Sequence, residues 1–96
     1  MIRHIVLFKM KEGTRAEERE ELIEALKGLK AKVPVVKELE VGVDVGGSPR
    51  SYDLALSSTF ESMEDVGVYS AHPDHIEVVG RINELCEPVV KVDYEF

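Results

Sequence analysis

The sequence predicts an α+β domain of the ferredoxin-like βαββαβ class, with a four-stranded antiparallel sheet and its helices on one face. Three observations lead to this prediction. Four segments alternate between apolar and polar side chains, two regions have apolar side chains at helical spacing, and their order is strand, helix, strand, strand, helix, strand. The chain has 96 residues, so we expect a single domain over residues 1–96.

The first strand is expected from Ile2 to Met10, where large apolar side chains occur on both faces. Phe8 lies on the same face as His4. Ile5 and Leu7 lie on the opposite face. Because a strand that is apolar on both faces needs cover on both, we expect it at the centre of the sheet.

The first helix is expected from Arg15 to Val33. Thr14 and Glu17 have the spacing of a capping box, in which two side chains satisfy free backbone N–H groups at a helix start. The apolar stripe of this helix consists of Leu22, Ile23, Leu26, Leu29 and Val33. Pro34 ends the helix, because proline lacks an N–H and its ring clashes with the preceding turn.

Two strands follow, and we expect them from Val36 to Val45 and from Tyr52 to Phe60. The first of these alternates cleanly between apolar and acidic or glycine positions, which is typical of a half-buried strand near a sheet edge. The segment Gly46–Pro49 between them is expected to be a loop. In the second strand, Leu54 and Leu56 share one face.

The second helical region is expected to break at Pro73, because proline fits well only at the first position of a helix. A short helix follows Ser62, and a longer one begins at Pro73 and ends at Glu87–Pro88. The inward side chains of the longer helix are expected to be Ile76, Val79, Ile82, Leu85 and Cys86. The last strand is expected from Val89 to Phe96.

The helices can cover only one face of such a sheet. If His4 faces the helices, Ile5 and Leu7 lie on the uncovered face. An exposed apolar sheet face of that size is typical of a surface that binds a partner. We therefore expect a twofold homodimer in which two sheets pair face to face.

The composition argues against several classes of function. The 12 basic and 19 acidic residues give a net charge of −7, which disfavours binding to nucleic acid or to an anionic membrane. No apolar run approaches the roughly 20 residues of a membrane span. Cys86 is the only cysteine, so no intrachain disulfide can form, and we expect the protein in a reducing cytoplasm.

The candidate functional residues are His4, Tyr69, His72 and His75. Because Tyr69 and His75 flank the helix break and His4 is expected to face the helices, we expect these three residues to meet in one pocket. A neutral histidine can act as a general base, and a tyrosine hydroxyl can donate to a developing oxyanion. The alternative is structural, since a histidine at a helix start often acts as a cap and an inward histidine on a strand often belongs to the core.

The histidines are also candidates for a metal site. His72 and His75, with His4 nearby, are residues that zinc or nickel would accept as ligands. Pro73 lies between the first two and no carboxylate clearly converges with them, so we expect no metal. The pair Gly46–Gly47 lacks the helix and lysine of a phosphate-binding loop, and we expect no cofactor.

Over essentially its whole length, the chain resembles the stress-responsive A/B barrel family of dimeric α+β barrel proteins. The resemblance rests on the order and spacing of five segments, which are His4–Lys9, Val33–Pro34, Thr59–Ser62, Tyr69–His75 and Val92–Tyr94. It implies a ferredoxin-like fold and a homodimer formed through the sheets, in agreement with the patterns above.

One branch of that family is a cofactor-free plant polyketide cyclase. Likeness to this branch implies that Tyr69 and His75 form a catalytic pair and that His4 lines the pocket. The cyclase has a tyrosine and a histidine where this chain has Leu26 and Leu54, so the pocket implied here is drier and has fewer groups to orient a polyketide. The expected ligand-binding residues are His4, Leu26, Leu54 and His72.

Three functions are consistent with these residues. The first is a small homodimer that binds a small apolar or aromatic molecule in a mostly apolar pocket. The second is a cofactor-free cyclase, lyase or monooxygenase that uses His75 as a base and Tyr69 as an oxyanion donor. The third is a purely structural dimer whose histidines only fix the helix break, and in it His75→Ala would cost about 1 kcal/mol of stability or more.

Overall fold

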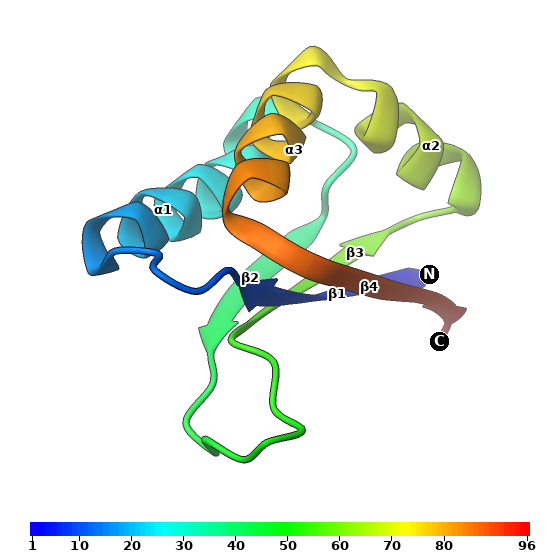
Figure 1. Ribbon diagram of the computed structural model, residues 1–96. Coiled ribbons are helices and arrows are strands. Elements are labelled where there is room, and N and C mark those ends of the chain that lie inside the picture. The colour runs from blue at the N-terminus through cyan, green and yellow to red at the C-terminus, as the bar shows by residue number, and fades with distance from the viewer.

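The elements follow one another in the order strand, helix, strand, strand, two helices, strand. The computed structural model describes residues 1–96 (Figure 1). The elements are β1 (Ile2–Met10), α1 (Ala16–Lys32), β2 (Glu38–Val43), β3 (Leu54–Phe60), α2 (Met63–Ala71), α3 (Pro73–Leu85) and β4 (Cys86–Glu95). The predicted ferredoxin-like class is therefore confirmed, and the second helical region is broken at His72, directly before Pro73.

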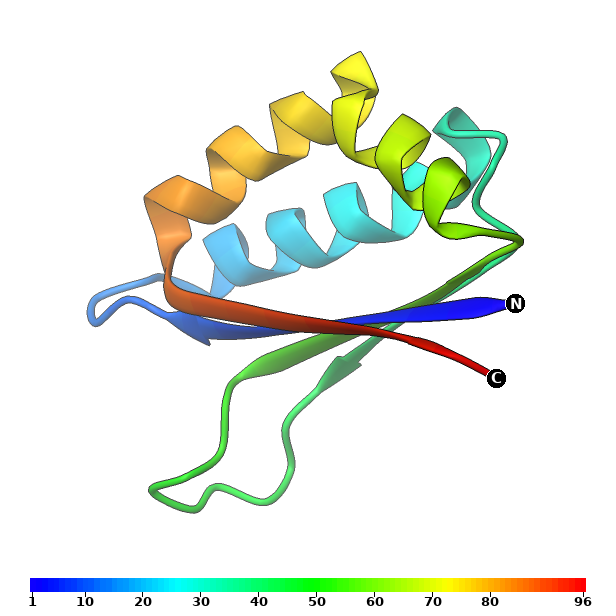
Figure 2. The ribbon, with the colours of Figure 1, turned by 90° about the vertical axis from the view of Figure 1, so that its right-hand side faces the viewer.

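The four strands form one antiparallel sheet in the order β2-β3-β1-β4. This order confirms that β1 is central and that β2 lies at an edge. All three helices lie on the same side of the sheet, and the loop between β2 and β3 extends away from them (Figure 2). No helix is long and apolar enough to cross a membrane.

The hydrophobic core lies between the helices and the side of the sheet beneath them, which we call the covered face. Its largest fully buried apolar side chains are Tyr69, Phe8, Phe60, Leu22, Leu26, Leu29, Leu54 and Leu56. Phe8, Leu26 and Leu56 are each only 1% exposed. The predicted inward faces of the first strand, the first helix and the third strand are therefore correct.

We call the opposite side of the sheet the open face. Its apolar part lies on β1 and β4, and β2 and β3 contribute polar or small residues; its members are Arg3, Ile5, Leu7, Glu38, Glu40, Gly42, Ala55, Ser57, Thr59, Val90, Val92 and Tyr94. In the antiparallel register, Ile5 lies opposite Val92 and Leu7 lies opposite Val90. Val90 and Val92 are both exposed. The predicted apolar surface therefore exists, and β4 extends it beyond the two residues of β1.

The helix start at α1 differs from the predicted one. Arg15 is the N-cap, and its backbone N–H donates to the carboxylate of Glu18 at 3.0 Å. Thr14 instead donates its hydroxyl to the carbonyl of Lys11 at 2.7 Å, which closes the preceding turn. The predicted capping box between Thr14 and Glu17 is therefore wrong by one residue at each position.

The inward face of α3 also differs from the prediction. Ile82 is buried, as predicted, and Val79 lines a cavity, but the buried residue one turn before Ile82 is Val78, whereas Ile76 is 57% exposed. Ile76 lies two positions before Val78, which is about 200° around a helix, so both cannot face the core. The helix packs against α1 through the face that contains Val78.

The last strand begins three residues earlier than predicted. Met10 lies opposite Cys86 and Phe8 lies opposite Val89, so β4 has one more residue than β1 in this stretch. Such a bulge accommodates Pro88, which has no N–H to donate to the ladder. Pro88, which we predicted to end the helix, therefore lies inside β4.

Candidate functional site

A cavity of about 400 Å³ lies between the covered face and the helices. Its volume is in the range of sites for small molecules. Twelve of its 17 lining residues are hydrophobic. The other five are His4, Ser70, His75, Asn83 and Lys91, and Tyr69, which is one of the twelve, adds a hydroxyl group.

Tyr69 lies on α2, at the centre of the polar group. The helix begins at Ser62, whose hydroxyl accepts the backbone N–H of Asp65 at 3.2 Å. The ring of Tyr69 is 2% exposed and lies 5.1 Å from the ring of Phe60. Burial raises the pKa of Tyr69 to about 12. Its hydroxyl is therefore neutral at ordinary pH and can act as a hydrogen-bond donor.

His75 lies in the first turn of α3, next to Tyr69. The two ring centroids are 4.3 Å apart. Nδ1 of His75 lies 3.1 Å from the backbone carbonyl of Ser70, which can only accept, so Nδ1 holds the proton. Burial lowers the pKa of His75, and the nearby His4 and His72 lower it further, against the raising effect of the Ser70 bond. The ring is thus neutral at ordinary pH, with Nε2 free to accept a proton.

His4 lies on β1 and is 7% exposed. Its ring centroid is 6.0 Å from that of Tyr69, in an edge-to-face arrangement. Nδ1 of His4 is 2.5 Å from Oδ1 of Asp93 on β4, and Oδ2 of Asp93 accepts from Nζ of Lys91 at 2.7 Å. Burial alone would raise the pKa of Asp93, but the hydrogen bonds from Lys91 and His4 outweigh it and lower that pKa.

Asp93 is the residue of this site that the sequence reasoning missed. The alternation of the last strand indicates only that Asp93 lies on its polar side. His4 and Asp93 lie directly opposite each other in the β1–β4 register, so the pairing of the first and last strands would have been the signal. That register depends on the bulge near Pro88, which the sequence pattern did not reveal.

The other expected site residues lie in different places. Leu26 lines the cavity, but Leu54 does not, although it is buried. Leu54 lies opposite Phe8 in the sheet, and its neighbour on the same face, Leu56, lines the cavity instead. His72 is outside the lining, because it caps α3 and its Nδ1 accepts the backbone N–H of Asp74 at 3.1 Å.

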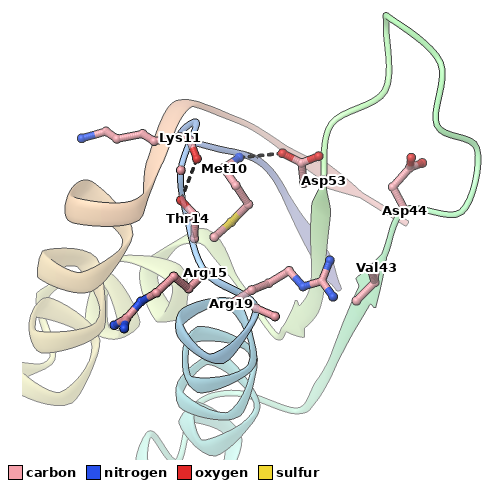
Figure 3. A pocket seen from close by; sticks show the side chains of 10 residues that line it. Met10, Lys11, Thr14, Arg15, Arg19, Val43, Asp44 and Asp53 are labelled. Atoms are coloured by element: carbon pink, nitrogen blue, oxygen red, sulfur yellow. Dashed lines mark hydrogen bonds between the residues drawn. The ribbon is translucent and has the colours of Figure 1, made fainter.

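A second hollow, of about 350 Å³, lies at the start of α1 (Figure 3). Of its basic side chains, only Arg19 extends toward the side on which Asp44 and Asp53 lie (Figure 3). Asp53 already accepts the backbone N–H of Met10 at 2.7 Å, and the side chains of Lys11 and Arg15 point away from Asp44 (Figure 3). The cavity that contains the two imidazoles is therefore the better candidate for function.

The cavity brings together the elements of proton-transfer chemistry. Its polar end contains a neutral imidazole that can take a proton, a tyrosine hydroxyl that can donate to an oxyanion, and a second imidazole paired with a carboxylate. Its remaining walls are apolar, which suits a ligand with an apolar or aromatic body.

Sequence comparison relates the chain to known proteins over its whole length. The sequence profile of the Stress Responsive A/B Barrel Domain matches residues 2–96. The chain is 32% identical over 96 residues to the stress-response A/B barrel domain-containing protein HS1 of Arabidopsis thaliana, covering 98% of this chain and 88% of that protein. It is 25% identical over 95 residues to olivetolic acid cyclase of Cannabis sativa, covering 97% of this chain and 94% of that enzyme.

Comparison with solved structures also relates the chain to ferredoxin-like proteins. A dimeric ferredoxin-like protein of unknown function from Thermobifida fusca superposes with a TM-score of 0.89 at 29% identity, covering 99% of this chain and 90% of that one. The hydroxynitrile lyase of Passiflora edulis superposes with a TM-score of 0.88 at 26% identity, covering 97% of this chain and 90% of the enzyme.

Proposed function

The chain belongs to the stress-responsive A/B barrel domain family, and from this premise we propose that it is a small homodimer that binds a small apolar or aromatic molecule in the cavity, without a cofactor. The observation that supports this most strongly is the cavity itself. About 400 Å³ of space has mostly apolar walls, and two imidazoles, His4 and His75, lie beside the ring of Tyr69. His4, His75 and Leu26 are the other ligand-binding residues of the proposal.

The homodimer is proposed to form through the open face. Val90, Val92 and Tyr94 are 43%, 52% and 42% exposed, and they continue the apolar surface of Ile5 and Leu7. Pairing this surface with its copy around a twofold axis removes it from water. The Thermobifida fusca neighbour is described as dimeric, which supports this arrangement.

Ligand binding can be tested with two matched variants on α3. Val79 lines the cavity, and Ile76 is exposed on the same helix. A panel of small aromatic and alkyl compounds is screened for an increase in the melting temperature of the wild-type dimer. We expect Val79→Phe to weaken binding of each hit at least tenfold, because the added ring occupies the cavity, while Ile76→Phe binds as the wild type does. An equal loss in both variants, or the absence of any stabilising compound, would contradict the proposal.

A second candidate function is cofactor-free catalysis, and the contact between Tyr69 and His75 favours it. A neutral base lies 4.3 Å, centroid to centroid, from a neutral hydroxyl donor. Two relatives are named as enzymes, a cyclase and a lyase. We propose that His75 takes a proton from the substrate through Nε2 and that Tyr69 stabilises the oxygen on which charge develops.

Catalysis can be tested with aromatic cyanohydrins and linear β-polyketones as substrates. If turnover is found, we expect His75→Ala and Tyr69→Phe each to lower kcat/KM by about 100-fold or more, as the loss of a general acid or base does. His72→Asn is the matched control, because His72 lies outside the cavity lining and asparagine can still cap α3. Unchanged turnover in His75→Ala would remove this residue from the mechanism.

A further inference from the structure

His4 and Asp93 form a buried pair at the edge of the cavity. Both side chains are 9% exposed, and Nδ1 of His4 lies 2.5 Å from Oδ1 of Asp93. The two residues are directly opposite in the β1–β4 ladder. Their separation is therefore set by the regular pairing of two strands and not by a loop.

The carboxylate determines which nitrogen of His4 holds the proton. Lys91 donates to the second oxygen of Asp93 at 2.7 Å, so both carboxylate oxygens are engaged and the group is held in its ionised form. An ionised carboxylate can only accept a hydrogen bond, so Nδ1 of His4 is the donor. In the neutral ring, Nε2 then has no proton, and no hydrogen bond within the chain engages it.

The His4 ring lines the cavity and packs against its aromatic side chains. The ring is edge-to-face with Phe60, at 6.1 Å between centroids, and with Tyr69, at 6.0 Å. Since the two ring nitrogens lie on opposite sides of an imidazole, Nε2 points away from Asp93. His75 has the same arrangement of its proton, because Nδ1 donates to the Ser70 carbonyl. The polar end of the cavity thus contains two imidazoles with free Nε2 atoms.

We propose that Asp93 is a positioning residue that holds the proton of His4 on Nδ1, so that the cavity presents two acceptor nitrogens to a ligand with hydroxyl donors at its polar end. This inference deepens the proposed function and rests on it for its ligand part. The chemical class that fits is an apolar or aromatic body with a phenol-type hydroxyl. Tyr69 lies beside both His4 and His75, and its hydroxyl can either donate a hydrogen bond to the same ligand or accept one from it.

The ligand part can be tested with phenol and anisole, which differ in the hydroxyl donor. The probes are added separately to 15N-labelled wild-type dimer, and the imidazole nitrogen signals are followed by NMR. We expect phenol to shift the Nε2 signals of His4 and His75 and anisole to shift them less than one third as far. Equal shifts with both probes would overturn the ligand class. No shift with either probe would overturn the ligand class and count against the proposed binding function.

The role of Asp93 is tested without any ligand, by two-bond 1H–15N correlation spectra that report which ring nitrogen is protonated. Besides Asp93, the polar groups that face His4 are Lys91 from β4, Ser58 from β3, Tyr69 from α2 and His75 from α3. In the neutral ring we expect wild-type His4 to be protonated on Nδ1. We expect both Asp93→Asn and Asp93→Leu to lose this form, because Lys91 donates to the amide oxygen of the asparagine and leaves the amide NH2, a donor, facing Nδ1.

Two controls complete the measurement. Lys91→Met should leave the His4 tautomer unchanged, since Lys91 acts only on the carboxylate. His75 should keep its Nδ1 proton in every variant, because a backbone carbonyl holds it. Persistence of the Nδ1 proton on His4 in Asp93→Leu would overturn the proposal. So would a wild-type His4 protonated on Nε2, a result that needs no variant to fold. Because neither outcome involves a ligand, failure here is distinguishable from failure of the proposed binding function.

Discussion

The covered and open faces of the sheet are made by the same strands but have different surroundings. Alternate residues of β1 divide between them, with His4 and Phe8 on the covered face and Ile5 and Leu7 on the open face. Phe8 is 1% exposed, whereas Val92 on the open face is 52% exposed. One strand can therefore serve two purposes, because its side chains alternate between a cavity inside the domain and a surface that needs a partner.

The two faces also differ in the hydrogen-bond partners of their polar groups. In the cavity between the covered face and the helices, each imidazole has a fixed partner, Asp93 for His4 and the carbonyl of Ser70 for His75. The open face has aliphatic side chains without cover on β1 and β4. Its charged groups lie beside them: Arg3, whose guanidinium lies 4.3 Å from the ring of Phe96, and Glu38 and Glu40 on the edge strand β2. Oriented polar groups suit ligand recognition, whereas an apolar layer suits association with a second copy.

The largest expected effect is on the covered face. Leu56→Ala removes a side chain that is 1% exposed and leaves a cavity beneath the helices. We expect it to lower the free energy of unfolding by about 2–5 kcal/mol, as measured by urea denaturation. Val45→Ala, at a side chain that is 99% exposed, should change stability by no more than about 0.5 kcal/mol. If both variants lower the free energy of unfolding by the same amount, the core does not lie between the covered face and the helices.

The next effect is on the open face. Val92→Asp places a carboxylate at the centre of the proposed interface, where it would lose water without gaining a partner. We expect the dissociation constant of the dimer to rise at least about 100-fold, or about 2.7 kcal/mol, as measured by analytical ultracentrifugation. Val45→Asp makes the same change in the loop beyond β2 and should leave the dimer intact. A wild-type chain that sediments as a monomer at micromolar concentration would contradict this use of the open face.

A smaller effect distinguishes the histidines on the helical side. His72→Ala removes the side chain that accepts the backbone N–H of Asp74, and we expect a loss of about 1 kcal/mol in unfolding free energy. His72→Asn should restore most of that stability, since asparagine is a good N-cap. Neither variant should change ligand binding. Loss of binding in His72→Asn would instead place His72 in the ligand site.

The smallest effect is a pH dependence that comes from His75. Burial lowers its pKa below 6.5 in the folded protein, so the unfolded chain takes up this proton at a higher pH than the folded one. Stability from this source is complete above pH 6.5 and is lost as the pH falls from there through the folded pKa. We expect thermal denaturation of His75→Gln to show a shallower loss of stability between pH 6.5 and pH 5 than the wild type. If the two proteins lose stability equally between pH 6.5 and pH 5, His75 is not desolvated in the folded state.

Much of the architecture was predictable from the sequence because it depends on local periodicity. The two-sided apolar pattern of the first strand placed it at the centre of the sheet, and the clean alternation of the second placed that strand at an edge. Pro73 marked the break between α2 and α3. Each of these features requires only the repeat of one element and the stereochemistry of proline.

What the sequence did not reveal depends on how elements meet. The pairing of His4 with Asp93 requires the β1–β4 register, and a bulge of one residue at Pro88 decides that register. The choice of Val78 over Ile76 as the inward residue depends on the angle at which α3 meets α1. Leu54 and Leu56 have the same alternation, and only the position of the helices above the sheet selects Leu56 for the cavity.

The most direct test of this division between the faces is an NMR titration of the 15N-labelled wild-type protein with 1-naphthol, an aromatic body with one hydroxyl. We expect chemical shift changes at the amides of Tyr69, His75 and Val79, which line the cavity. We expect none at Val92 and Tyr94, which lie on the open face. Shift changes at Val92 and Tyr94 without changes at the cavity residues would contradict the account, because the covered face would then not be the ligand site.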